Sequence, residues 1–456
     1  MSWSRALGAS VREGLRYGDG RPQGLRYRDG RPQAQRCRCV VLLTLALVAQ
    51  PFRAAYAQPP TPATRLSFDQ AVQQAIDRNP TLRAAASAIL RAEGELRIAR
   101  SATLLQLSAA IATTTLNTGI SFDGTTVTPQ NSATATITAD MPVVAAAAWA
   151  RKAQAQDDRQ VATLNLADVR RQVAAATADA YLTIVGLRRI VDADAHARDN
   201  AKAHYDLANE LEQKGSGSRL NALRAQSQYS AILTTLEAAQ LAVYRAQEAL
   251  GVLVVATGPV DAGDEPAFDI PPDDTRLELF RTDLKLFAAE QNAAERVVRD
   301  SSKDWWPIVD ALFIPTATHP APFFTPAAGW QFQLRGNIPV FDSGARAGIK
   351  LQRQSAFEQA QQTLVGATEL AGAQARTARV AIASAERGLA SARLAADQAE
   401  QVVNITTISF RAGGATNIEV IDAQRAALDA ATQAATAQDI LTRAKFELIN
   451  ALGRFP

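Results

Sequence analysis

The sequence predicts a mainly α-helical protein with a small β part, in which long antiparallel helices carry four β-strands at one end. Three observations support this prediction. Two long segments, about 147–212 and 345–410, keep a helical period without a breaker. The stretches before each of them alternate with a period of two, which is typical of strands. Landmark motifs return at a nearly constant distance, so the chain is predicted to contain one unit twice.

The internal repeat is clearest in two glycine-containing stretches. LEQKGSGSRLNALRAQ and SFRAGGATNIEVIDAQ align with Gly215 on Gly413, which are 413 − 215 = 198 positions apart. DMPVV around Pro142 and NIPVF around Pro339 align at 339 − 142 = 197. Two landmarks that share one spacing predict a duplicated unit of roughly two hundred residues, far longer than a solenoid repeat.

The first 57 residues are predicted to be a signal peptide with an unusual N-terminal extension. Basic residues precede an apolar run at 40–49, and the small-x-small sequence AYA at 55–57 is a typical cleavage site. The mature chain is expected to begin near Gln58, after Ala57. No later apolar run reaches the length of about twenty residues that a membrane-spanning helix needs.

Cysteine and charge are both concentrated in this leader. Cys37 and Cys39 are the two cysteines of the chain, so the mature protein is expected to have no disulfide, thiolate catalysis or lipid-anchor cysteine. Residues 1–57 hold ten Arg and three acids. The remainder therefore carries (48 − 10) − (45 − 3) = −4, and the main argument for nucleic-acid binding disappears.

The first unit is predicted at 58–253. Ser67 and Gln70 form a capping box that starts a helix, Asn79-Pro80 interrupts it, and helix resumes to about Ser101. The elements that follow are strands at about 104–115 and 131–142, a long helix, a turn at about 213–218, and a short helix to about 252.

The second unit is predicted at 278–456, after a linker at 254–277. It repeats the same order, with a helix, strands at about 306–315 and 329–340, a long helix, a turn at about 411–416 and a short helix. The assignment of 306–315 is ambiguous, because Ile308, Leu312 and Ile314 lie on the side that should be polar.

Each clear strand has one apolar side and one small-polar side. Ile137 alternates with threonines, and Trp330 and Phe332 alternate with glutamines. An apolar exterior around a polar face is typical of membrane β-barrels. The residues predicted to face lipid are Leu105, Leu107, Ile137, Trp330, Phe332 and Leu334.

Four strands cannot close into a barrel alone, because two edges remain unpaired. Bacterial membrane barrels have at least eight strands, so the chain is expected to be an oligomer that pools its strands. Two copies would supply eight strands and three would supply twelve, and periodicity does not choose between them.

The combination of motifs resembles the TolC family of outer-membrane efflux proteins. LSFDQAVQQAIDRNPTLRAA, NIPVFDSG with its partner DMPVV, and SFRAGGATNIEVIDAQRAALDAA occur in family order across nearly all of the mature chain. The resemblance implies a homotrimer with a twelve-stranded barrel in the outer membrane of a Gram-negative cell and a helical tunnel across the periplasm. It also implies docking to a periplasmic adaptor and an inner-membrane transporter, in a tripartite efflux or type I secretion system.

The resemblance places a periplasmic gate at the start of the last short helix. Glu419 and Asp422 lie three apart and would form rings of carboxylates in a trimer, with Phe410 as a further part of the constriction. The alternative is that Thr416 and Glu419 form a capping box without a gating role. Asn221 and Ala415 stand where family members carry charges, which puts a salt link across the closed mouth in doubt.

The two glycine-containing turns are the expected adaptor-docking tips. For each glycine the alternative is plain turn chemistry. The predicted docking residues are Lys214, Gly215, Ser216, Gly217, Ala412, Gly413 and Gly414.

No enzyme, cofactor or metal site is expected. His196, His204 and His319 are too few and too scattered for a metal centre, and no nucleophile, base and orienting group recur at workable spacing. The competing class is a soluble periplasmic coiled-coil scaffold, which would explain the long helices and leave the alternating strands without a role.

Overall fold

The computed structural model of the protein describes residues 63–270, 276–321, 323–324 and 326–455. All of them belong to one compact unit, Pro60–Pro456. The predicted signal peptide and its cleavage site lie outside the described residues, as do residues 271–275 of the predicted linker.

Two long helices dominate this unit. Helix α4 (Ala146–Gln213) has 68 residues and α8 (Ala345–Arg411) has 67, so each extends about 100 Å at 1.5 Å per residue. Each turns back into a helix of 35 residues, α5 (Arg219–Leu253) after α4 and α9 (Asn417–Ala451) after α8. The result is two helical hairpins of matching length, in agreement with a repeated unit.

The other half of each long helix is accompanied by a helix that precedes a strand. Helix α3 (Pro80–Ser101) packs along α4, and α7 (Thr282–Arg299) packs along both α4 and α8. Helix α2 (Phe68–Arg78) begins at the Ser67–Gln70 capping box, and the Asn79 side chain caps α3 at Pro80. Two short helical segments complete the set, α6 (Leu277–Phe280) and the 3-10 helix η1 (Asp300–Trp305).

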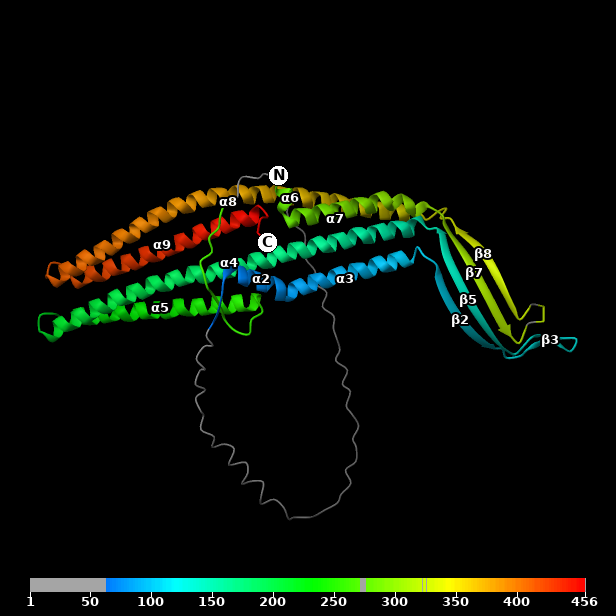
Figure 1. Ribbon diagram of the computed structural model, residues 1–456, viewed down its shortest axis with the longest axis horizontal. Helices are drawn as coiled ribbons and strands as arrows, with labels where there is room; N and C mark the ends of the chain where they lie inside the picture. Colours follow the sequence, from blue (N-terminus) through cyan, green and yellow to red (C-terminus); the bar gives the residue numbers. More distant parts are fainter. Residues whose placement is uncertain (1–62, 271–275, 322, 325, 456) are drawn as a thin grey trace, which may run out of the picture. The chain divides into compact units, whose positions relative to one another are not determined.

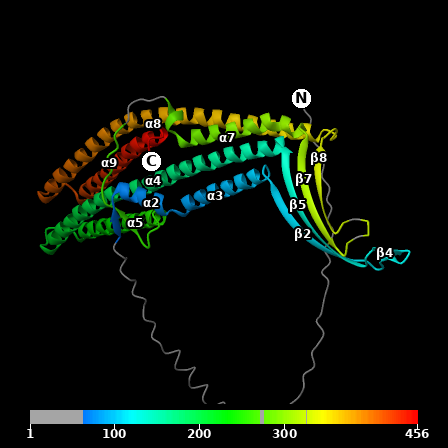
Figure 2. The ribbon, with the colours of Figure 1, turned by 45° about the vertical axis from the view of Figure 1, so that its right-hand side comes forward.

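The helices lie side by side in a layer (Figures 1 and 2). Toward the strands the order of neighbours is α3, α4, α7, α8. Toward the two turns it is α5, α4, α9, α8. Helix α8 therefore forms one edge of the layer along its whole length, and α3 and α5 together form the other.

The strands form a four-stranded antiparallel sheet at the end opposite the turns (Figure 2). Its order is β2, β5, β7, β8, so β2 and β8 are the edge strands. The ambiguous stretch 306–315 is strand from Ile308 onward, and Leu105 lies one residue before β2. The bounds are β2 Gln106–Thr115, β5 Asn131–Val144, β7 Ile308–His319 and β8 Ala328–Asn337.

Two further strand pairs were not expected from the sequence. A hairpin of β3 (Ile120–Phe122) and β4 (Thr125–Thr128) extends the connection between β2 and β5. Strand β1 (Thr64–Leu66) pairs in parallel with β6 (Val260–Ala262), which lies inside the predicted linker. This second pair ties the start of the first unit to the segment that follows it.

The largest apolar core surrounds Tyr181, near the middle of α4. The rings of Phe68 and Tyr181 meet edge to face at 5.4 Å, and Tyr181 is completely buried. Its hydroxyl hydrogen-bonds with the Asp264 carboxylate and accepts the Asp264 backbone N–H at 3.1 Å. Burial and then the Asp264 hydrogen bond raise the pKa of Tyr181 to about 12, so the phenol stays protonated. The linker is thereby held against α4.

The stacked short helices meet at two junctions built alike. In the first unit, Asn79 Nδ2 donates to the carbonyl of Leu253, the last residue of α5, at 3.3 Å. In the second, Arg281 Nη1 donates to the carbonyl of Ala451, the last residue of α9, at 3.1 Å. In both cases the residue before one short helix binds the end of the other.

Among the described residues, no helix has the length and apolar character needed to cross a membrane.

We expect Gly453→Ala to destabilise the protein more than Gly413→Ala. Both glycines have a positive φ, +71° and +79°, and alanine costs about 1–2 kcal/mol in this region. A Cβ at Gly453 would also lie 2.7 Å from the Arg281 backbone nitrogen, whereas one at Gly413 would meet nothing within 4 Å. Thermal melting followed by circular dichroism measures the difference. Equal losses would show that the second junction is not tightly packed.

Candidate functional site

The first tip turn is residues 214–218 and the second tip turn is residues 412–416, both exposed almost throughout. Gly215 and Gly413 occupy equivalent positions in them, with φ of +75° and +79°. Each turn ends in a hydroxyl N-cap, Ser218 in the first and Thr416 in the second. The predicted docking residues thus lie on two equivalent, accessible turns, and their contact with an adaptor remains a prediction.

Glu419 completes a capping box at the start of α9. The Thr416 N–H donates to Glu419 Oε2 at 2.6 Å, and the Glu419 N–H donates to Thr416 Oγ1 at 3.3 Å. The hydrogen bond from the Thr416 backbone, and after it one from the Thr416 side chain, lower the pKa of the Glu419 carboxyl group. Its carboxylate therefore stays charged to lower pH than an ordinary glutamate. The capping role is present in the structure, and it leaves the exposed charge available for a second role.

The other two predicted gate residues have different surroundings. Asp422 is exposed one turn further along α9. Phe410 is half-buried near the end of α8, and its ring lies 5.1 Å from the ring of His204 on α4. The aromatic residue therefore packs against the neighbouring hairpin within one chain.

Several hydrogen bonds join the two hairpins near the tips, and the one nearest to the turns is between His204 and Asn417. His204 Nε2 and Asn417 Oδ1 are 2.8 Å apart, and both side chains are 3% exposed. Further along the same helices, Gln424 Nε2 donates to the Asn200 carbonyl at 3.1 Å. From the sequence, His204 is considered only as a metal ligand, and Asn417 is not singled out. The available signal for this contact was a histidine at a position of α4 that faces another helix.

The sheet has the two chemically different faces that the alternation predicts. Cross-strand pairing aligns Leu107 with Ala139, Ala139 with Phe313, and Phe313 with Phe332, so these four form one row. Along β5 this apolar side is mostly the more exposed one, and the threonine side is half-buried. The residues predicted to face lipid, apart from the preceding Leu105, alternate in this way within the strands, and all six are exposed.

The polar face of the sheet carries a charged group near the helices. Asp310 and Arg335 are paired across β7 and β8, and their side chains approach to 3.4 Å. Asp140 of β5 lies 4.0 Å from the same guanidinium. Leu312, one of the residues that made this strand ambiguous, is buried on this face between Asp140 and Gln333.

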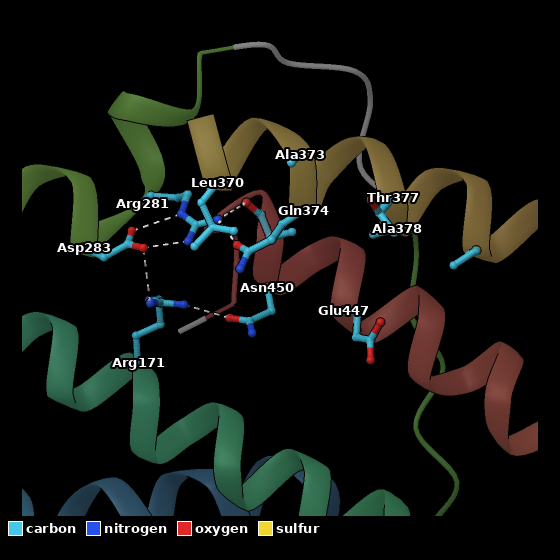
Figure 3. A pocket seen from close by; sticks show the side chains of 12 residues that line it. Arg171, Arg281, Asp283, Leu370, Ala373, Gln374, Thr377, Ala378, Glu447 and Asn450 are labelled. Carbon is cyan, nitrogen blue, oxygen red and sulfur yellow. Dashed lines mark hydrogen bonds and ion pairs between the residues drawn. The ribbon is translucent and has the colours of Figure 1, made fainter. Parts of the chain in front are cut away.

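A cavity of about 650 Å³ opens at the second junction, where α4, α7, α8 and α9 meet (Figure 3). Its polar end is a connected group of side chains. Arg281 donates to Asp283 at 2.6 Å, and Arg171 lies 3.9 Å from the same carboxylate while donating to Asn450 at 3.0 Å. Burial alone raises the pKa of Asp283, but its hydrogen bonds and the charges of Arg281 and Arg171 outweigh this and lower it. The charges compensate one another and hold the junction together.

Among the residues that the structure describes, no group of three His, Cys, Asp or Glu side chains is arranged to hold an ion. The chemistry offered by the candidate site is a set of exposed carboxylates on helical tips and a two-faced sheet. Such features suit the passage of solutes better than their conversion.

Comparison with known proteins defines the class. The sequence matches the family described as outer membrane efflux protein over residues 71–254 and 277–454, that is, once in each unit. The chain belongs to the outer membrane efflux protein family. The predicted family, the fold of two repeated units with a small β part, and the function of an outer-membrane efflux channel are confirmed, and nothing favours a soluble scaffold.

Solved structures agree with this fold. The chain is similar to the CmeC outer membrane channel of Campylobacter jejuni, with 15% identity, coverage of 85% of this chain and 86% of that one, and a TM-score of 0.76. It is also similar to the outer membrane protein VceC of Vibrio cholerae, with 18% identity, 85% and 96% coverage, and a TM-score of 0.73. The MtrE outer membrane channel of Neisseria gonorrhoeae, in its open state, matches with 16% identity, 85% and 88% coverage, and a TM-score of 0.72. No curated protein sequence matches significantly.

We expect Glu419→Gln and Glu419→Ala to separate the capping role from the charge. Glutamine at this position also completes a capping box, because its side-chain oxygen accepts the Thr416 N–H. Alanine removes that acceptor. Amide hydrogen exchange in the first turn of α9 should therefore quicken in Glu419→Ala and stay near the wild-type rate in Glu419→Gln. Faster exchange in both variants would mean that the charge, rather than the hydrogen bond, holds the turn.

Proposed function

We propose that three copies of the chain close into one tube that crosses the outer membrane and extends into the periplasm. The observation that carries this proposal is that both edges of the helical layer expose apolar side chains on the sides that face away from their neighbours. Helices of about 100 Å with such edges need partners along their full length. A second copy offers the complementary edge.

The α8 edge carries a regular apolar line. Five of the large exposed apolar residues of α8 recur every 14 or 15 positions, which is about four turns of 3.6 residues, so these five lie on one side of the helix. Val380 lies two positions from both Ala378 and Ile382, which pack in the core between α8 and α9. Two positions turn a helix by more than half a circle, so the line points away from α9. Its members are Leu351, Val365, Val380, Leu394 and Ile408.

The opposite edge has the same property. On α3 and α5, exposed apolar residues lie two positions from buried ones, and they therefore point away from α4. The exposed and buried pairs are Leu90 with Ala92, Leu220 with Ala222, Leu223 with Ala225, and Val252 with Leu250. Packing of the α8 edge of one copy on the α3 and α5 edge of the next is head to tail, and such contacts form a ring when the rotation between copies closes.

The sheet supports the same arrangement. Strands β2 and β8 end the four-stranded sheet, and exposed edges are usually paired or covered. Pairing β8 of one copy with β2 of the next in three copies gives 3 × 4 = 12 strands, an even number in the range of outer-membrane barrels. The apolar row through Leu107, Phe313 and Phe332 would then face lipid.

The proposed role is that of a passive exit duct, without catalysis, in a tripartite efflux or type I secretion system. The signal peptide would direct the chain across the inner membrane and be removed near Gln58. A periplasmic adaptor would engage the two tip turns, and an inner-membrane transporter would supply the cargo. Rings of three Glu419 and three Asp422 carboxylates at the mouth would favour cations and repel one another.

We expect Leu394→Glu to weaken the assembly of the copies, and Leu370→Glu to leave it intact. The two leucines are on the same helix and are equally exposed at 59%, but Leu370 lines the cavity and Leu394 lies on the edge. Burying a leucine contributes about 1.5–3 kcal/mol, which glutamate would remove at every contact between copies. Light scattering of the detergent-solubilised protein gives the number of copies as temperature rises. The same dissociation temperature in both variants would contradict this edge as the contact.

We expect the purified protein to give discrete, cation-favouring conductance steps in a planar bilayer. In Glu419→Gln/Asp422→Asn the preference for cations should fall, because the carboxylate charge at the mouth is removed while the capping box is kept. Reversal potentials in a salt gradient measure the preference. Well-assembled copies without any steps would contradict an open-ended duct, and unchanged selectivity in the variant would contradict the acidic mouth.

A further inference from the structure

The contact between His204 and Asn417 is the point where the two hairpins are joined nearest to the tips. It links His204, nine residues before the end of α4, to the first residue of α9, directly after the second tip turn. The His204 ring also lies against Phe410, so it touches the chain on both sides of that turn. The His204 side chain therefore contacts the second hairpin on both sides of its tip turn.

This contact is buried but incompletely satisfied. His204 Nδ1 and Asn417 Nδ2 are both buried, and neither has a hydrogen-bond partner among the residues that the structure describes. Buried polar atoms without partners are uncommon and cost free energy that water would relieve. The closed contact is thus held by one good hydrogen bond and an aromatic contact, against two groups that gain from exposure.

We propose that His204 is a positioning residue for the gate, and that protonation of its imidazole releases the second hairpin from the first. This inference rests on the proposed function of the tips as the mouth of an efflux duct. It adds a regulator of that mouth, the proton concentration of the surrounding compartment.

The chemistry of the contact gives the direction of the effect. Asn417 Oδ1 can only accept, so the neutral imidazole donates from Nε2–H and leaves Nδ1 without a proton. Protonation adds an N–H at Nδ1, in a buried position where no acceptor lies, and it places a positive charge there. When the hairpins separate, water solvates both. Acid therefore favours the separated arrangement.

No nearby charge compensates the imidazolium. On α4, Lys202 and Asp206 pair with each other, and Tyr205 stacks on Tyr229 of α5. On α8 the charged residue closest in sequence to Phe410 is Arg411, which is exposed. On α9 the charged residue closest in sequence to Asn417 is Glu419, whose carboxylate accepts the Thr416 N–H. Within the described part of the chain, His204 forms no ion pair with an acidic side chain.

The pH window follows from the sign of the shift. Burial lowers the pKa of His204 in the joined arrangement, and the Asn417 hydrogen bond opposes this only partly. Above the ordinary histidine pKa of about 6.5 both arrangements hold a neutral ring, and the joined one keeps its full stability. As the pH falls below that value, the separated arrangement binds a proton first. The joined arrangement loses stability until the pH reaches its own lowered pKa.

One other buried group on α4 titrates in the opposite sense. Asp194 is 3% exposed, and burial raises its pKa. Its protonation in acid therefore favours whichever arrangement keeps it buried. Removing the His204 titration should leave this opposing trend, so the two contributions can be told apart by Asp194→Asn.

The first experiment compares conductance between pH 7.5 and 5.0 in wild type, His204→Gln and His196→Gln. Wild type should open several-fold more often as the pH falls, and His196→Gln should behave in the same way, because His196 is an exposed histidine on the same helix. His204→Gln keeps a hydrogen-bond donor but cannot titrate, and it should lose the increase. The same acid opening in His204→Gln would overturn the proposal.

Asn417→Asp provides a test that a merely structural role would not pass. A carboxylate facing Nε2 would form an ion pair with the protonated ring, so acid should now strengthen the contact and reduce opening. The sign of the pH dependence should reverse between wild type and this variant. Aspartate is also acceptable in the first turn of a helix, which protects the fold. An unchanged sign would overturn the proposal.

A distance measurement keeps this test independent of conductance. Residues 58–456 contain no cysteine, so in a protein that begins at Gln58 spin labels can be placed at Ser216→Cys and Ala415→Cys alone. The distance between the two tip turns should lengthen in acid for wild type and should not lengthen for His204→Gln. A pH-independent distance in conducting wild-type protein overturns the inference and leaves the duct standing. A pH-dependent distance in protein that never conducts overturns the duct and leaves the hairpin release standing.

Discussion

A helix of about 100 Å cannot bury its own apolar side chains, and this constraint organises the whole molecule. Each long helix needs neighbours along its full length, yet the chain must also turn back and reach the sheet. The solution is to divide each neighbour into two short helices. One belongs to the hairpin at the tips and the other leads to a strand. The resulting layer has two free edges. The exposed apolar residues on these edges also need partners, which in the proposed assembly are neighbouring copies.

Dividing a helix creates an end that must be satisfied, and the two junctions show how this is done. The last carbonyls of α5 and α9 would otherwise lack donors at a packed position. Asn79 supplies one side-chain donor, and Arg281 supplies the other. The change from amide to guanidinium brings a charge, so the second junction also needs Asp283 and gathers Arg171 and Asn450 around it. The cavity lies where this larger group replaces close packing.

Much of this fold could be predicted from the sequence, because its elements are long and periodic. The alternation in β5, the glycine in each tip turn and the capping boxes at Ser67 and Thr416 are local signals that survive without tertiary information. The parallel pair of β1 and β6 was missed, since three-residue strands carry no period. His204 and Asn417 were missed for a different reason. Their roles depend on which faces of α4 and α9 meet, and the sequence around each residue does not show which faces these are.

The equal lengths of α5 and α9, 35 residues each, have an evolutionary consequence. The two tips reach the same level only while the arms of both hairpins match, and the arms are packed residue against residue. An insertion in one arm would need a compensating insertion in the other arm of that hairpin, and a second pair in the other hairpin. Changes in the length of the helical tunnel should therefore be rare, and they should consist of matched insertions or deletions of whole helical turns in all the arms. Single-residue indels in the arms should be strongly selected against.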